Sequence, residues 1–281
     1  MAGTGMISLL LIIANIIFSY KGFTIESFFE GYKFEVEKIL VNKDYKRLIT
    51  SGFLHINWTH LILNMVSLVL FSASIESYLG SLPFLAIYFA SLLGGNLLSL
   101  FIHRHHGDYS AVGASGAVCG IIFSFIALFP GSSVGFFFIP FPIPGWLYGL
   151  AYVLYSIYGI RSKKDNIGHD AHLGGALIGM LVALLMHPAA FTENTTTILI
   201  IAVPAILFIC LIIIKPHFLL IDNFFYNAHH HYYDVDHKYN FNKANQQAEI
   251  DRILDKISRS GVKSLNKKEK QTLDEYSGKR R

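Results

Sequence analysis

Residues 113–129 read GASGAVCGIIFSFIALF, a run of very small residues around one serine that leads directly into an apolar stretch. The apolar stretch is typical of a membrane-spanning helix, and small residues allow other backbones to approach a helix closely in lipid. Ser115 therefore lies where a span begins, with almost no side-chain bulk around its hydroxyl. Its role depends on which groups the rest of the chain brings to it.

The composition of the whole chain indicates a polytopic membrane protein. Apolar residues make up 53% of the 281 residues, charged residues make up 15%, and the mean hydropathy is +0.45. These values exclude an ordinary soluble domain. Cys119 and Cys210 both lie in apolar runs, which argues against a disulfide framework. The N-terminal stretch has no basic region and no small-residue cleavage site, so we expect a retained first span.

Seven stretches are apolar and long enough to be spans within a bundle. They cover residues 5–20, 57–79, 83–102, 114–129, 145–160, 169–187 and 195–214. We therefore predict an all-α membrane helix bundle, with a six-span core in residues 1–190, a seventh span in residues 191–216 and a polar tail in residues 217–281. A long, mixed-charge loop follows the first span, and loops of this length are often functional.

The tail is predicted to form a small helical hairpin. The apolar stripe of its first helix consists of Ile250, Ile253, Leu254 and Ile257. Gly261 would end this helix, and Asn266 with Glu269 has the spacing of a capping box for a second helix.

Polar residues occur at the starts of the second, fourth and sixth predicted spans. The second begins with HINWTHLILN, the fourth with Ser115 and the sixth with GHDAHLGGALIG. If every span crosses, these starts lie on the same face of the membrane and at similar depth. Polar side chains inside a membrane usually face one another or a water-filled cavity. We therefore predict one polar pocket where the three spans meet, with His169 and Asp170 at its mouth.

Two stripes of small residues predict which helices touch. They consist of Gly116, Gly120 and Ser124 in the fourth span, and Gly175, Gly179 and Ala183 in the sixth. Such stripes allow two helix backbones to approach closely in lipid. Packing the stripes together would bring Ser115 toward His172.

A serine and a histidine brought together in this way have the chemistry of a catalytic dyad. The serine hydroxyl is a weak nucleophile and needs a neighbouring base such as His172. The backbone N–H of Ser115 and the side chains of His60 and Asn64 can donate hydrogen bonds to an oxyanion. Asp170 is only two positions from His172 on a helix, so it is not placed to orient the imidazole, and we expect a slow enzyme.

At these residues the sequence resembles the rhomboid family of intramembrane serine proteases, over residues 47–187. The resemblance rests on HINWTHLILN, GASG and AHLGGALIG, in this order and on the expected spans. It implies a bacterial-type rhomboid with an extra C-terminal span, with Ser115 as nucleophile, His172 as base, and His60 and Asn64 as oxyanion donors.

The resemblance also implies structural roles for other residues. Gly113 is similar to the first glycine of the serine motif, and Gly175 to the glycine that lets the sixth span approach the fourth. Glu76 and Arg47 resemble structural positions of the family. We expect His55 to bond to the neighbouring loop rather than to take part in catalysis.

The sequence departs from the family pattern beside the predicted dyad. Many rhomboids carry an aromatic residue that stacks on the catalytic histidine at the position of Cys119, and some carry Trp-Arg where this chain has Lys46-Arg47. We expect another side chain to fill the gap at Cys119, with Tyr155 and Tyr158 as candidates. We also expect Cys119→Phe to be tolerated.

Two functions remain open, a membrane-embedded serine endopeptidase and a non-catalytic rhomboid-like protein that binds transmembrane helices. The presence of both Ser115 and His172 favours the first. The expected partners are transmembrane protein substrates and the lipid bilayer, with no nucleic acid, no cofactor and no metal. The histidine clusters at residues 103–106 and 227–237 could bind metal, but solvated segments are favoured.

The orientation in the membrane is a point of conflict. With seven spans, all 23 Lys and Arg residues fall on the side where the pocket opens, which the positive-inside rule would make cytoplasmic. The resemblance implies a bacterial inner-membrane protein whose active site opens to the outer face. Because long loops count little in the rule, we expect the family orientation for the pocket and leave the side of the tail open.

Overall fold

The computed structural model describes residues 5–136, 139–162 and 167–214, together with residues 253, 256, 257, 265 and 269. The chain divides into two compact units, Met1–Asn223 and Phe224–Arg281. The first unit contains the apolar helices and the predicted site.

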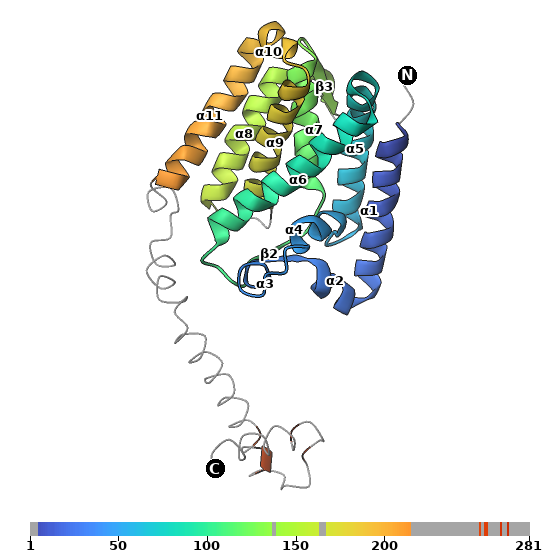
Figure 1. Cartoon of the computed structure of the whole chain (residues 1–281), viewed down its shortest axis with the longest axis vertical. Helices are drawn as coiled ribbons and strands as arrows, with labels where there is room; N and C mark the ends of the chain where they lie inside the picture. The colour runs from blue at the N-terminus through green and yellow to red at the C-terminus, as the bar shows by residue number, and fades with distance from the viewer. Residues whose placement is uncertain are drawn as a thin grey trace. The chain divides into compact units, whose positions relative to one another are not determined.

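Seven helices of 14 residues or more form the bundle of the first unit, within the described residues (Figure 1). They are α1 (Met6–Thr24), α5 (Trp58–Leu79), α6 (Ser81–His103), α7 (Ser115–Leu128), α8 (Gly145–Ser162), α9 (His169–Met186) and α11 (Thr195–Ile214). All except α7 and α8 are long and apolar enough to cross a membrane. The predicted all-α membrane bundle is thus confirmed, and each predicted stretch corresponds to one of these helices.

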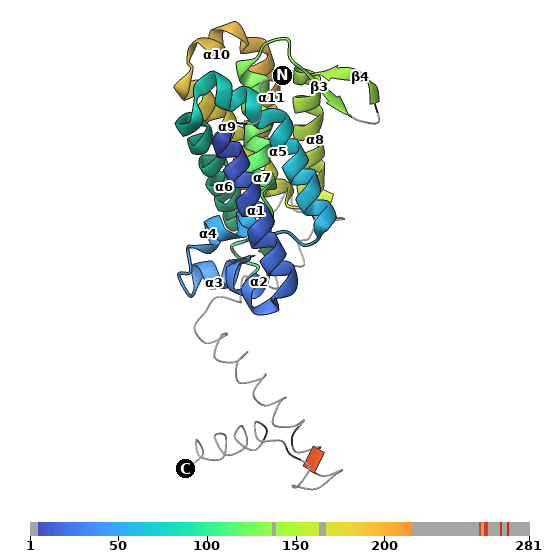
Figure 2. The same ribbon diagram turned by 90° about the vertical axis from the view of Figure 1, so that its right-hand side faces the viewer.

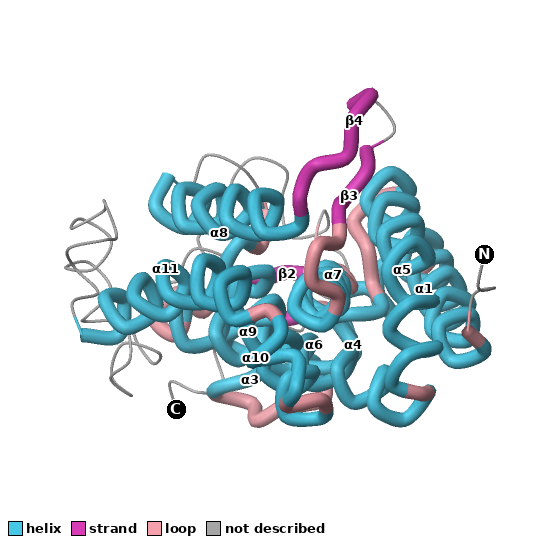
Figure 3. Tube along the Cα trace, turned by 90° about the horizontal axis from the view of Figure 1, so that it is seen from above, coloured by secondary structure: helices cyan, strands magenta, loops and turns pink. Residues whose placement is uncertain are grey.

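The short helix α7 runs through the centre of the bundle, with α5, α6, α8 and α9 around it (Figure 3). Nearly all its side chains are buried, as expected for a helix that is apolar on every side. Its 14 residues rise about 21 Å, less than the roughly 30 Å of a bilayer core. At its C-terminal end, Asn194 Nδ2 donates to the carbonyl oxygens of Ile126 (2.8 Å) and Ala127 (3.2 Å). The short length of α7 therefore places Ser115, at its other end, inside the bundle.

The segment between α1 and α5 is folded rather than loose (Figure 2). It contains α2 (Glu26–Tyr32), α3 (Val36–Leu40), α4 (Arg47–Thr50) and a 3-10 turn, Ser51–Phe53. Its strand β1 (Phe34–Glu35) pairs antiparallel with β2 (Ser110–Ala111). Phe34, Val36 and Ile39 form a separate small core. The pairing fastens this segment to the residues that precede Ser115.

Arg47 holds the same segment together from inside. Its guanidinium donates to the carbonyl oxygens of Glu30 (2.9 Å) and Lys33 (2.8 Å), and its Nε donates to Asp44 (2.9 Å). The side chain is buried, so these bonds satisfy donors that water does not reach.

Two short connections complete the first unit. A hairpin of β3 (Ser133–Phe136) and β4 (Ile139–Pro144) joins α7 to α8 and projects beside the bundle (Figures 2 and 3). The helix α10 (Ala189–Glu193) joins α9 to α11.

The second unit is described at only a few positions. Ile253 and Leu265 are buried, and Lys256 Nζ donates to both carboxylate oxygens of Glu269 (2.9 and 2.8 Å). The rest of the predicted tail hairpin and the histidine cluster at residues 227–237 lie outside the described residues.

Candidate active site

The backbones of α7 and α9 touch along the two predicted stripes of small residues. A Cβ atom on Gly175 would overlap the carbonyl group of Gly116, and one on Gly179 would lie 2.5 Å from the carbonyl oxygen of Gly120. No larger side chain fits at either position without separating the helices. This contact positions the starts of α7 and α9 beside each other.

The helix α6 also takes part in this contact, which was not predicted from the sequence. A Cβ atom on Gly95 would overlap the carbonyl oxygen of Ala171, and one on Gly120 would overlap the Ser91 side chain. The signal in the sequence is the Gly94-Gly95 pair in the middle of the third span. The contact is therefore a three-helix junction rather than a pair.

Ser115 and His172 form a hydrogen bond at this junction. Ser115 is the first residue of α7, and its Oγ lies 2.6 Å from Nε2 of His172 in the first turn of α9. Both side chains are partly buried. With a neutral imidazole that carries its proton on Nδ1, the serine hydroxyl donates to Nε2, which is the arrangement that a nucleophile and its base require.

Tyr152, on α8, lies on the other side of the imidazole. Its hydroxyl is 2.9 Å from Nδ1 of His172 and 3.0 Å from Sγ of Cys119. The prediction that Tyr155 or Tyr158 fills the gap at Cys119 was wrong. Tyr155 contacts the ring of His169, and Tyr158 is 59% exposed. A signal was available, since the buried residues Gly149 and Ser156 stand three and four positions from Tyr152 and mark the inward face of α8.

Gly113 allows the His60 ring to lie close to Ser115. This residue has a φ of +136°, and a Cβ atom there would lie 2.9 Å from Nε2 of His60 and 3.6 Å from Oγ of Ser115. The His60 ring thus stands beside the serine. Asn64 is buried on the same face of α5, and its Nδ2 donates to the carbonyl oxygen of His60 (2.9 Å).

His55 connects α1 with the start of α7. Its Nδ1 lies 2.8 Å from the Ser19 hydroxyl on α1, its Nε2 accepts from the Ala114 N–H (3.5 Å), and its ring lies edge-on to His60. Burial, together with the nearby His60, lowers the pKa of His55 to about 3. The ring is therefore neutral and acts as a fixed hydrogen-bonding link between α1 and the start of α7.

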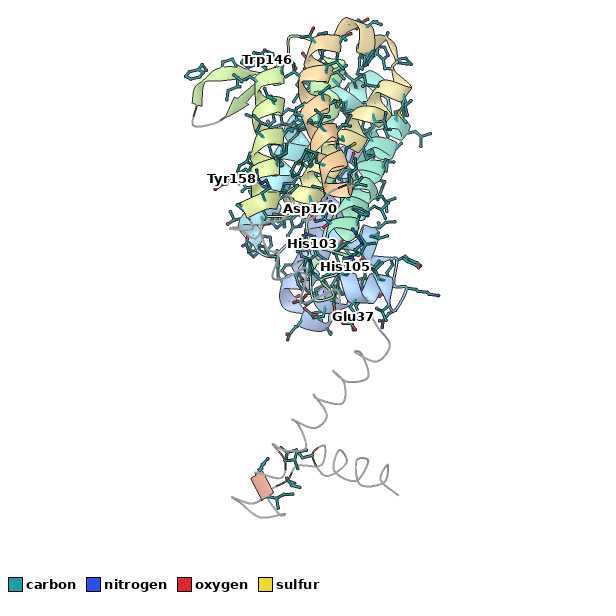
Figure 4. All side chains as sticks on the ribbon, turned by 90° about the vertical axis from the view of Figure 1, so that its left-hand side faces the viewer. Glu37, His103, His105, Trp146, Tyr158 and Asp170 are labelled. Atoms are coloured by element: carbon teal, nitrogen blue, oxygen red, sulfur yellow. The ribbon has the colours of Figure 1, made fainter. Side chains whose placement is uncertain are left out.

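His169 and Asp170 do not line the mouth of the site, contrary to the prediction. Both are buried, and Asp170 Oδ2 lies 3.1 Å from Nε2 of His103 at the end of α6. In Figure 4, His103 and Asp170 lie close together, at the same end of the bundle as Glu37 and opposite to Trp146.

His103 also stacks on Tyr109, with ring centroids 3.6 Å apart. Burial and the nearby Asp170 raise the pKa of Tyr109 well above its ordinary value. Asp170 thus joins α9 to the end of α6, and His103 continues the contact to Tyr109 in the segment before α7. Among the residues that the structure describes, no group of three or more His, Cys, Asp or Glu side chains could hold a metal ion.

Comparison with known proteins decides the family of the chain. Residues 42–189 match the Rhomboid domain. The chain belongs to the rhomboid family. The matched residues include the Ser115–His172 pair, His60, Asn64 and Gly113. Residues 233–279 of the tail match a second family, DUF6576, which is described as a family of unknown function.

Similar proteins of this family occur in eukaryotes and bacteria. Rhomboid protein 1, mitochondrial, of Saccharomyces cerevisiae is 32% identical over 53% of this chain and 45% of its own length. RHOMBOID-like protein 12, mitochondrial, of Arabidopsis thaliana is 34% identical over 48% of this chain and 44% of its own. The putative rhomboid protease YdcA of Bacillus subtilis is 37% identical over 34% of this chain and 48% of its own. The chain spans about half the length of these relatives, and as a rhomboid it is an integral membrane protein.

Proposed function

We propose that this rhomboid is an intramembrane serine endopeptidase that cleaves transmembrane proteins with a Ser115–His172 dyad. The observation that carries the proposal is the 2.6 Å separation of Ser115 Oγ and His172 Nε2, at the buried junction of three helices. A serine in a glycine-rich helix is usually a packing residue, but a packing role does not require an imidazole at hydrogen-bonding distance.

The reaction follows from this geometry. Ser115 Oγ attacks the carbonyl carbon of the scissile peptide while its proton moves to His172 Nε2. The imidazolium then gives this proton to the leaving amine nitrogen, the C–N bond breaks, and an acyl-enzyme remains. A water molecule then takes the place of the serine in the same steps. It loses a proton to His172 while its oxygen attacks the ester carbon. The proton returns to Ser115 Oγ as the carboxylic product leaves.

The hydrogen-bond donors near Ser115 are suited to the oxyanion of each tetrahedral intermediate. The His60 ring lies against Gly113, and the backbone N–H of Ser115 is in the first turn of α7, where N–H groups have no intrahelical partner. The helix dipole favours negative charge at this end. Asn64 can serve as a further donor once its amide turns from the His60 carbonyl oxygen that it now binds.

The proposed substrates are transmembrane segments with small or helix-breaking residues near the membrane boundary. In lipid every backbone group of a helix is bonded within the helix, so a carbonyl becomes accessible only where the helix unwinds. A non-catalytic rhomboid that binds transmembrane helices is the second candidate, and it would have no need for the hydrogen bond between Ser115 and His172.

Labelling by a serine-reactive fluorophosphonate, together with cleavage of a model transmembrane substrate, tests the proposal. We expect wild-type protein to be labelled, and Ser115→Ala to lose both labelling and cleavage, with turnover reduced at least about 10⁴-fold. Ser124→Ala is the matched control, because Ser124 lies on the same helix and bonds to the Gly120 carbonyl oxygen. Equal cleavage by Ser115→Ala would refute the protease. Binding of the substrate without cleavage by wild-type protein would favour the second candidate.

We also propose that the protein resides in a bacterial plasma membrane, with the site opening to the outer face. The relatives named above include both mitochondrial and bacterial proteins, so the membrane and the orientation have to be tested by topology experiments. Glu37→Cys and Phe141→Cys place exposed cysteines at opposite ends of the bundle. In intact cells an impermeant maleimide should label Glu37→Cys only. Labelling of Phe141→Cys alone would show the opposite orientation in the membrane.

A further inference from the structure

We propose that Tyr152 is a positioning residue that holds His172 in its reactive tautomer, and that Cys119 both accepts the Tyr152 hydrogen bond and leaves room for its ring. The inference deepens the proposed protease function and rests on it. It concerns the three side chains that follow one another behind the dyad: His172, Tyr152 and Cys119.

The hydrogen bonds form a continuous chain from the nucleophile into the core. Ser115 Oγ lies 2.6 Å from His172 Nε2, His172 Nδ1 lies 2.9 Å from the Tyr152 hydroxyl, and that hydroxyl lies 3.0 Å from Cys119 Sγ. The four groups lie in turn on α7, α9, α8 and again α7, so this series of hydrogen bonds begins and ends on α7 and connects three helices. Each contact is within hydrogen-bonding distance.

Only one direction of these bonds leaves the dyad reactive. His172 can accept the Ser115 proton at Nε2 only when its own proton is on Nδ1, and Nδ1–H then donates to the Tyr152 oxygen. The Tyr152 O–H in turn donates to Cys119 Sγ. In the opposite direction the thiol would donate to Tyr152, Tyr152 to Nδ1, and Nε2–H would face the serine and block the proton transfer.

The chemistry of the last group selects the reactive direction. A thiol is a weak hydrogen-bond donor, whereas the imidazole N–H and the phenol O–H are good donors. At Cys119 the reactive direction makes the phenol O–H the donor and the sulfur the acceptor. The opposite direction relies on the thiol as a donor. A neutral Tyr152 thus performs the orienting task that an aspartate performs in a triad, without supplying its charge.

Packing explains why residue 119 is small. The Tyr152 ring lies against Phe123, one turn beyond Cys119 on α7, with centroids 5.7 Å apart. Cys119 is buried beneath the Tyr152 hydroxyl. A phenylalanine at residue 119 would need the space that the end of Tyr152 occupies. From this packing we expect Cys119→Phe to be harmful, although the sequence pattern predicts that it is tolerated.

Tyr152→Phe in the full-length protein tests the positioning role, because it removes the hydroxyl and keeps the ring. We expect kcat on a model transmembrane substrate to fall about tenfold, the effect of losing one buried neutral hydrogen bond. KM should remain at the wild-type value. The exposed Tyr158→Phe on the same helix is the control and should behave as wild type. Wild-type kcat in Tyr152→Phe, with an active parent protein, would overturn the inference and leave the protease function intact.

A second measurement does not depend on turnover. In ¹⁵N-histidine-labelled protein, with the His172 signals assigned by comparison with His172→Gln, we expect a protonated Nδ1 in wild type and a mixture of tautomers in Tyr152→Phe. Unchanged His172 signals in Tyr152→Phe would overturn the inference. If wild-type protein neither cleaves nor is labelled at Ser115, the proposed function fails, whereas this spectrum still decides the role of Tyr152.

Exchanging the two side chains tests the packing argument. Cys119→Phe alone should lower the rate of fluorophosphonate labelling at Ser115 about tenfold or more, because the new ring pushes Tyr152 from His172. Adding Tyr152→Ala to Cys119→Phe should raise the thermal midpoint above that of Cys119→Phe by removing the collision, while labelling stays slow because the Tyr152 hydroxyl is absent. Wild-type labelling by Cys119→Phe, or a thermal midpoint in the double variant no higher than in Cys119→Phe, would contradict the shared space of residues 119 and 152.

Discussion

The carboxylate of Glu76, near the end of α5, accepts both the backbone N–H (3.0 Å) and the hydroxyl (2.8 Å) of Ser8, at the start of α1. It also accepts from the Ile7 N–H and the Ser81 hydroxyl. The first N–H groups of a helix have no intrahelical partner, and an anion there is favoured by the helix dipole. Glu76 therefore joins α1 to α5 at the end of the bundle opposite to the Ser115–His172 pair (Figure 1).

Glu76→Gln should lower the free energy of unfolding by about 1–3 kcal/mol, because an amide cannot replace both charged acceptor oxygens. Unfolding by SDS in mixed micelles measures this change. Activity below the unfolding transition should remain close to wild type, since the dyad is far away. The exposed Glu193→Gln serves as the control. Equal stability of Glu76→Gln and wild type would mean that the cap contributes nothing.

Gly175→Val should abolish close contact between α7 and α9, because even a Cβ atom at Gly175 overlaps the Gly116 carbonyl group. Overpacking costs typically about 1–3 kcal/mol, and a displacement of about 1 Å at the dyad can reduce the rate about 10²-fold. Substrate cleavage by membrane-inserted protein measures the loss. Gly31→Val is the control, since a Cβ atom at Gly31 meets no atom within 4 Å. Full activity of Gly175→Val would show that this contact does not set the dyad.

Gly113→Ala should reduce kcat by crowding the space between His60 and Ser115. Gly131→Ala separates this effect from backbone strain. Gly131 also has a positive φ, +76°, but a Cβ atom there meets nothing within 4 Å. Its alanine variant should lose only about 1–2 kcal/mol of stability and keep its activity. If both variants lose activity equally, backbone strain rather than the contact with His60 explains the glycine at residue 113.

His55 should make the folded protein sensitive to acid. The folded-state pKa of His55 is about 3, below its ordinary 6.5, because of burial and the adjacent His60. Between these values the unfolded chain binds the additional proton, so stability present above about pH 6.5 is lost as the pH falls toward 3. Thermal midpoints measured from pH 7.5 to 5 should decline less in His55→Gln than in wild type. Parallel declines would assign the acid sensitivity to other groups.

The membrane class, the positions of the helices and the convergence of Ser115 with His172 could all be predicted from the sequence. These features follow from short stretches of sequence. Each span in lipid requires a continuous apolar run, and the stripes of small residues at Gly116 and Gly175 indicate that two helix backbones are in contact. Alternation of spans across the membrane then places the starts of α5, α7 and α9 on one face.

The rotation of each helix about its axis was decided only by tertiary packing. Lipid-facing and core-facing residues of a span are equally apolar, so hydropathy does not distinguish Val153, which is buried, from Leu154, which is 53% exposed. For this reason the sequence could not tell which tyrosine of α8 faces His172, and Tyr152 was missed. For the same reason the contact that α6 makes through Gly95 was not predicted.

Contacts between distant polar segments were also decided by the tertiary structure. The pairing of β1 with β2 and the placing of Asp170 against His103 join residues far apart in the chain, and no periodic pattern in the sequence records them. Because a buried carboxylate must find a partner, Asp170 had to be paired, but only the packing of α6 against α9 determined that its partner is His103.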